Sequence, residues 1–187
     1  MKILCIANEI DPKLYTKEIR LEFKDIQFIL SSGNLPIEYL NFISQELKKP
    51  LYFVVAKHEL HSIEKPNSYL HLLNTPILIQ GLWIAGLSGA KKINNTIRQH
   101  TPIEQKRKIN AIGRHLFFKK MLGTKLDILV SCSKSTEDTA PLTRLIKKYE
   151  PRIFIYGQGH SYNEQERVST IKNTKLINVS GHYILDI

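Results

Sequence analysis

Short apolar segments alternate with amphipathic segments in the first third of the chain, and this alternation constrains the fold most strongly. Three apolar segments have the length and composition of buried strands: Lys2–Ile6, Ile26–Leu30 and Leu51–Val55. The charged segment Lys13–Lys24 between the first two predicts a helix. A second helix is expected to begin at Pro36, with apolar residues at helical spacing: Leu40, Ile43 and Leu47. The order strand, helix, strand, helix, strand is typical of a layered α/β fold.

A predicted hairpin interrupts this alternation in the middle of the chain. Residues 60–74 are polar and irregular, and two short apolar segments follow them, Pro76–Ile79 and Gly81–Gly86. The Gln80-Gly81 pair between these segments is typical of a tight turn. The sheet is therefore expected to be mixed and not purely parallel.

The second half of the chain returns to the alternating pattern. Thr101 as a cap, Pro102 in the first turn and Glu104 three residues after the cap predict the start of a helix that runs to about Met121. A later helix has an apolar stripe formed by Leu142, Leu145, Ile146 and Tyr149. Five further strands are predicted: Asp127–Val130, Ile153–Tyr156, Val168–Ile171, Leu176–Val179 and Tyr183–Ile187. Because the pattern contains no internal repeat or linker, we expect a single domain over residues 1–187.

The composition favours a globular protein of the cytoplasm. The apolar runs are far shorter than the ~20 residues that a membrane helix needs, and the two cysteines, Cys5 and Cys132, are too few for a disulfide scaffold. The net charge of +10, from 27 Lys and Arg against 17 Asp and Glu, is compatible with a phosphorylated partner or a nucleic acid. Since the chain is generally rich in Lys, a solvated basic surface is the simpler interpretation.

Polar residues follow five of the predicted strands, where reactive groups gather in layered α/β folds. They are Asn8-Glu9, Gly33-Asn34, Lys57-His58-Glu59, Ser131-Cys132-Ser133 and Gly157-Gln158-Gly159-His160. Their order indicates that residues distant in the sequence form one candidate site.

These clusters and their surroundings resemble the calcineurin-like metallophosphoesterases, in particular a branch of small bacterial single-domain members. The similar segments span nearly the whole chain: "MKILCIANEI", "ILSSGNLPIEYL", "FVVAKHE", "GLWIAGLSG", "DILVSCS" and "YGQGHS". The resemblance implies an α/β sandwich of four layers, in which two mixed β-sheets pack face to face and helices flank them. It also implies two metal ions, about 3.5–4 Å apart, that bind a phosphate ester and activate a water molecule.

Matched to the motifs of this family, most positions that should bind metal carry a substituted residue. Asn8 stands at an aspartate of the first metal position, and Asn34 stands where the family has the aspartate that bridges both metals. His160 keeps a family histidine of the first position. The resemblance thus implies a degenerate first metal site made of Asn8, Asn34 and His160.

The second metal position is changed further. Lys57 occupies the place of a ligand asparagine, where an ammonium group repels a cation, and Gln158 occupies the place of a histidine. Cys132 also replaces a histidine; its thiol is either a ligand for a soft metal or a small buried residue at a strand end. His58 matches the family histidine that assists phosphoryl transfer, so the resemblance implies a catalytic or vestigial role for it.

Three functional hypotheses are compatible with the sequence. The first is an inactive or impaired phosphoesterase homologue, a pseudoenzyme that acts by binding a protein or a phosphorylated ligand. The second is a metal-dependent phosphohydrolase for phosphodiesters or phosphomonoesters, with weakly bound Mn, Fe or Zn in a rearranged or single-metal site. That site would consist of Asn8, Asn34 and His160, with Glu9, Asp11 or Cys132 as alternative additional ligands and His58 assisting the reaction. The third and weakest is nucleic-acid binding through the basic helix 102–121, for which the sequence shows no aromatic stacking motif.

Overall fold

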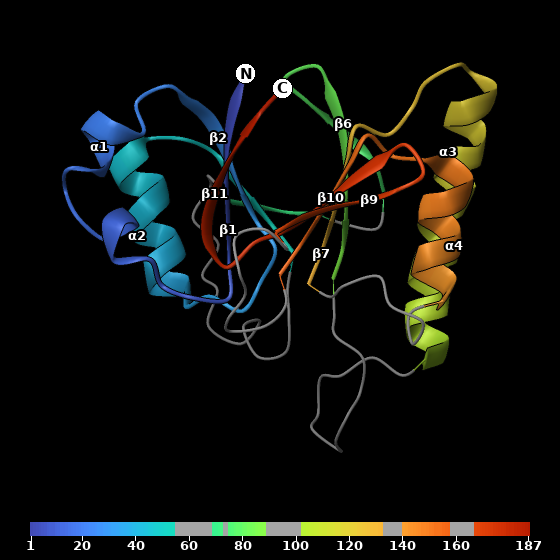
Figure 1. The fold of residues 1–187 in the computed structure, drawn as a ribbon, viewed down its shortest axis with the longest axis horizontal. Coiled ribbons are helices and arrows are strands. Elements are labelled where there is room, and N and C mark those ends of the chain that lie inside the picture. Colours follow the sequence, from blue (N-terminus) through green and yellow to red (C-terminus); the bar gives the residue numbers. More distant parts are fainter. Residues whose placement is uncertain (55–68, 73–74, 89–101, 133–139, 158–166) are drawn as a thin grey trace.

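The computed structural model describes residues 1–54, 69–72, 75–88, 102–132, 140–157 and 167–187. Within these ranges the strands form two sheets that face each other (Figure 1). The first sheet has the order β11-β1-β2-β3-β4 and consists of β1 (Lys2–Ala7), β2 (Ile26–Ser31), β3 (Leu51–Phe53), β4 (Tyr69–His71) and β11 (Gly181–Asp186). β1 to β4 are parallel, and β11 pairs antiparallel with β1.

The second sheet is also mixed. Its order is β5-β6-β7-β8-β10-β9, with β5 (Ile77–Ile79), β6 (Leu82–Leu87), β7 (Ile128–Ser131), β8 (Ile153–Tyr156), β9 (Val168–Ile171) and β10 (Thr174–Asn178). The four central strands are parallel, whereas β5 and β9 pair antiparallel at the two edges. The expected hairpin is therefore confirmed: Gln80 and Gly81, both at positive φ, turn the chain between β5 and β6.

Helices cover the outer face of each sheet. Figure 1 shows α1 (Ile19–Glu22) and α2 (Ile37–Leu47) on one side of the molecule, and α3 (Pro102–Met121) and α4 (Ala140–Tyr149) on the other. The layers are thus helix, sheet, sheet, helix, as expected from the sequence. None of the described helices is long and apolar enough to cross a lipid bilayer.

The strand sequences are almost continuously apolar because both faces of each sheet are buried. Along β1, Ile3 and Cys5 point into the core between the sheets, whereas Leu4 and Ile6 pack under α1 and α2. The same alternation holds in β8, where Ile155 faces the other sheet and the helix-facing side chains pack under α3 and α4. The buried residues that the structure describes therefore form three apolar cores, one in each space between adjacent layers.

One predicted helix is wrong. The segment Lys13–Lys24 is broken into a short 3-10 helix, Pro12–Leu14, and the four-residue α1. In a continuous helix Leu14 and Ile19 would point about 140° apart at 100° per residue, yet both are fully buried in the same core. The break lets both side chains reach the sheet.

β4 was not expected, because Tyr69–His71 lies in the polar segment 60–74. It is a short edge strand that pairs parallel with β3. The α3 boundaries, Pro102–Met121, agree with the sequence analysis, while the proposed cap Thr101 lies outside the described residues.

Candidate functional site

The carboxyl ends of strands from both sheets meet at one edge of the sandwich. Gly157, directly after β8 of the second sheet, lies against the ends of β1 and β2 of the first sheet. A Cβ atom on Gly157 would lie 2.8 Å from Ala7 Cβ, 3.0 Å from Ser32 Oγ and 3.1 Å from Asn8 Nδ2. The first distance is too short for a real Cβ atom and the other two are unusually tight, so glycine at this position allows the two sheets to approach. The structure thereby brings three of the five polar clusters toward one place.

Asn8 and Asn34 have the same unusual backbone conformation. Their φ angles are 63° and 62°, in the left-handed region that Asn, Asp and Gly tolerate best. The backbone N–H of Asn8 donates to the carbonyl of Gly33 at 3.2 Å, which ties the turn after β1 to the turn after β2. The choice of residue at both positions is therefore restricted by local geometry before any chemistry is considered.

The side chains of these two asparagines bind each other. Asn34 Nδ2 donates to Asn8 Oδ1 at 2.9 Å, and Asn8 Nδ2 donates to the Val179 carbonyl at 3.2 Å. Because that carbonyl can only accept, it fixes the orientation of the Asn8 amide and turns its oxygen toward Asn34. The two residues thus form a small amide pair that links β1, β2 and the end of β10.

This amide pair fits a two-metal centre poorly. A group that bridges two dications needs negative charge, and both residues here are neutral. In addition, Asn34 points an N–H group, the positive end of its dipole, at the Asn8 oxygen. Over the described ranges no three His, Cys, Asp or Glu side chains lie close enough together to hold a metal ion. The amide pair therefore offers no charged ligand to a metal ion at this position.

The remaining site residues divide into two groups. Cys132 is 5% exposed and belongs to the core between the sheets, a position that suits a small buried side chain. The other four lie outside the described residues: Lys57, His58, Gln158 and His160. Their roles stay predictions that come from the resemblance.

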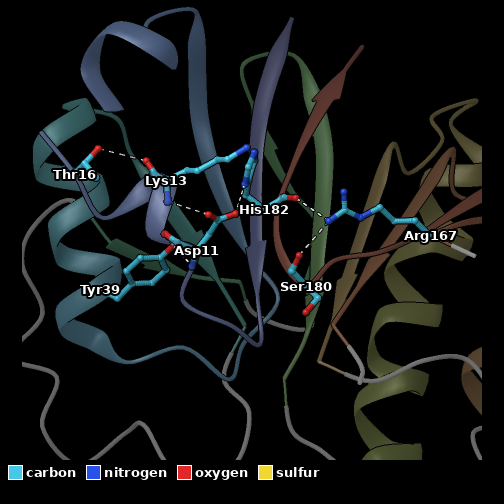
Figure 2. A network of polar contacts seen from close by, with 7 residues as sticks. All are labelled: Asp11, Lys13, Thr16, Tyr39, Arg167, Ser180 and His182. Atoms are coloured by element: carbon cyan, nitrogen blue, oxygen red, sulfur yellow. Dashed lines mark hydrogen bonds and ion pairs between the residues drawn. The ribbon is translucent and has the colours of Figure 1, made fainter. Parts of the chain in front are cut away.

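Asp11, suggested above as a replacement ligand, is engaged in a different network (Figure 2). Its Oδ2 lies 2.6 Å from Nδ1 of His182, and its Oδ1 accepts a hydrogen bond of 3.0 Å from the backbone of Lys13. The backbone N–H of Asp11 donates to the Tyr39 hydroxyl at 3.1 Å. Asp11 therefore holds the turn after β1 to β11 through its carboxylate and to α2 through its backbone.

Two opposing effects act on the pKa of Asp11. Partial burial raises it, but the hydrogen bond with His182, the N–H of Lys13 and the positive charges nearby outweigh burial and leave the pKa below its ordinary value. The ring of His182 also packs edge to face on Phe23, with centroids 5.5 Å apart. No local sequence signal joins these partners, because Asp11 and His182 are 171 positions apart.

Arg167 is a further residue that the sequence analysis missed. Its Nη2 donates to the carbonyls of Ser180 and His182, each at 3.1 Å (Figure 2). Its guanidinium carbon lies 5.6 Å from the ring centroid of Tyr183. Since Arg167 precedes β9 of the second sheet and its acceptors flank the start of β11 of the first, it joins the two sheets.

Solved structures resemble this architecture at low sequence identity. TT1561 from Thermus thermophilus matches with a TM-score of 0.63 and 11% identity over 96% of this chain and 88% of that one. A single mutant of Vps29 from Entamoeba histolytica matches over 100% and 86% of the two chains, with 14% identity and a TM-score of 0.41. A scan of protein-family models and a search of curated proteins find no match. The likeness establishes the metallophosphoesterase-like fold, two mixed sheets with flanking helices.

Proposed function

We propose that this protein is a catalytically impaired member of the metallophosphoesterase-like fold that acts by binding. The Asn8–Asn34 amide pair carries the proposal. Where the resemblance implies two aspartates, the chain has two neutral side chains: Asn34 donates a hydrogen bond to Asn8, and the Asn8 amide donates to the Val179 carbonyl. The left-handed backbone at both positions accepts Asp as well as Asn, so the backbone does not account for the missing charge.

The loss of charge removes the main reason for a divalent metal to bind there. Carboxylates at these positions would attract a cation and repel each other without one, whereas the amide pair is stable by itself. We therefore expect that added Mn²⁺ or Zn²⁺ does not change the stability of the folded protein. A protein or a phosphorylated ligand is the expected partner class.

Metal content and activity test this proposal directly. Purified protein should carry no stoichiometric Mn, Fe or Zn, and its hydrolysis of p-nitrophenyl phosphate and bis(p-nitrophenyl) phosphate with added Mn²⁺ or Zn²⁺ should not exceed that of a His58→Ala variant. Stoichiometric metal together with turnover that depends on His58 would overturn the proposal. That result would establish the second hypothesis, a phosphohydrolase with a rearranged site that includes Asn8, Asn34 and His160.

Restoring both carboxylates gives a second test. In the double variant Asn8→Asp, Asn34→Asp, two like charges would replace atoms that now lie 2.9 Å apart, so the melting temperature should fall without metal and recover when Mn²⁺ is added. A matched control variant carries two new carboxylates at exposed positions, Gln27→Glu and Gln45→Glu. Added Mn²⁺ should not raise the melting temperature of this variant or of wild type. A wild-type melting temperature that rises with Mn²⁺ as much as that of the double variant contradicts the proposal.

A further inference from the structure

An open groove runs between α3 and α4 on the outside of the second sheet, away from the Asn8–Asn34 pair. Its volume is about 720 Å³, and residues of both helices line it. The groove arises from the topology: β6, β7 and β8 are parallel neighbours, and α3 and α4 are the two crossovers that connect them. Both helices pack on the same face of the sheet and lie side by side (Figure 1).

The lining is strongly basic. Lys106 and Arg114 come from α3, and Arg144 and Lys148 come from α4. Among the lining residues that the structure describes, none is acidic. In the described part of the chain these four side chains take part in no salt bridge. Four cations around one groove give it a positive potential that favours an anionic occupant.

Aromatic side chains lie among these cations. Phe117 is 50% exposed and Phe118 is 63% exposed, and both line the groove. Tyr149 lines the same groove from the other helix, and its ring lies 3.9 Å from where a Cβ of Gly113 would be. Large aromatic groups left half in water gain free energy when a flat apolar surface covers them. The occupant should therefore offer flat rings as well as negative charge.

We infer that this groove binds single-stranded nucleic acid. Phosphates would contact the lysine and arginine side chains, and bases would stack on the aromatic rings, the combination that single-strand binding grooves use. Lys106, Asn110 and Arg114 follow one another at intervals of four residues, or roughly 6 Å along the helix, a spacing on the scale of one nucleotide in an extended strand. A duplex would keep its bases stacked inside and leave the aromatic rings uncovered.

The sequence could not show this combination. The sequence showed the basic residues of the segment 102–121. The other helix supplies Arg144, Lys148 and Tyr149, which reach the groove only because both crossover helices cover the same face of the sheet. Arg114 and Lys148 are far apart in the sequence, yet they line the same groove.

Fluorescence anisotropy tests the inference with two labelled probes, a fifteen-nucleotide oligodeoxythymidine and a fifteen-nucleotide oligouridine. Both should bind the full chain at 50 mM salt. If the four cations each neutralise one phosphate, the affinity should fall about 50-fold between 50 and 200 mM salt, from a slope of roughly 0.7 per contact. A duplex of the same length should bind more weakly.

Matched variants separate the groove from general basicity. The double variant Arg114→Ala, Arg144→Ala should bind at least tenfold more weakly and with a shallower salt dependence, whereas Lys17→Ala, Lys24→Ala on the opposite side of the sandwich should bind as wild type. Phe117→Leu keeps an apolar side chain but removes the ring, so it should weaken binding by about fivefold or more. Leu21→Ala, at a side chain that is 78% exposed on α1, is its control.

Several results would overturn the inference. They are no anisotropy change with either oligonucleotide at 50 mM salt, equal weakening by the groove and control variants, and tighter binding of the duplex. Tighter binding of poly-glutamate or of vesicles with anionic lipid would instead assign the groove to an acidic protein or to a membrane surface. Circular dichroism of each variant verifies that the fold is intact. None of these results depends on the metal and activity tests of the Asn8–Asn34 site.

Discussion

At the scale of single residues, close approach and backbone conformation determine the candidate site. Gly157 is required where two sheets touch, and Asn8 and Asn34 occupy left-handed turns at the strand ends. The sequence identified all three positions through the order of its motifs. It did not reveal that the two asparagines bind each other, because that contact depends on the pairing of β1 with β2.

Replacing Gly157 by alanine should destabilise the fold. The new Cβ would approach Ala7 Cβ to 2.8 Å, and overpacking of this kind costs about 1–3 kcal/mol. Gly113→Ala is the matched control: its Cβ would lie at an ordinary 3.9 Å from Tyr149, and a helix interior favours alanine over glycine by about 1 kcal/mol. Urea unfolding should show opposite signs for the two variants, and equal stabilities would contradict the close contact.

The Asp11–His182 contact predicts a specific acid sensitivity. The pKa of Asp11 is lower in the folded than in the unfolded state, so its contribution to stability is fully present above the unfolded value of about 3.9 and is lost as the pH falls through the folded pKa. Asp11→Asn should make the free energy of unfolding fall less steeply between about pH 5 and about pH 2. Asp25→Asn, at a carboxylate that is 64% exposed and lies 3.8 Å from Lys2 Nζ, is the matched control.

At the scale of elements, amphipathic spacing predicted the long elements well and the short ones poorly. α2 and α4 appear where apolar residues recur at helical spacing, because each needs one face buried against a sheet, and α3 appears where helix-start residues predicted it. The segment after β1 failed this rule, since its short elements are shaped by contacts with the sheet and with α2. β4 was not predicted for a similar reason: a three-residue edge strand forms through its pairing with β3 and has no clear pattern of its own in the sequence.

The broken helix can be tested with two leucines. Leu14 and Leu21 are seven residues apart and would share one face of a continuous helix, about 20° apart at 100° per residue. In the structure Leu14 is 0% exposed and Leu21 is 78% exposed. Leu14→Ala should therefore cost about 2–5 kcal/mol, and Leu21→Ala should stay within about 0.5 kcal/mol of wild type. Similar costs for both variants in denaturant unfolding would support the continuous helix.

At the scale of the whole molecule, the two sheets are held together by their shared apolar core and by polar contacts at its rim. Arg167 is the clearest of these contacts, because its guanidinium donates to two carbonyls around the start of β11 while its own chain continues into β9. Arg167→Ala would remove both hydrogen bonds and should lower the free energy of unfolding by about 2–3 kcal/mol. Arg152→Ala, at an exposed arginine before β8, should have little effect.

The sequence by itself determined the layered fold and the identity of the strand-end residues. Apolar periodicity is a local property, and the same strands that bury both faces must also present their polar ends at one edge. Only the tertiary structure decided what those residues do with one another. Three features join segments that are distant in the sequence: the Asn8–Asn34 pair, the Asp11–His182 contact and the basic groove between α3 and α4. Hydrogen bonds, burial and charge depend on distance in space, and the order of residues along the chain does not specify that distance.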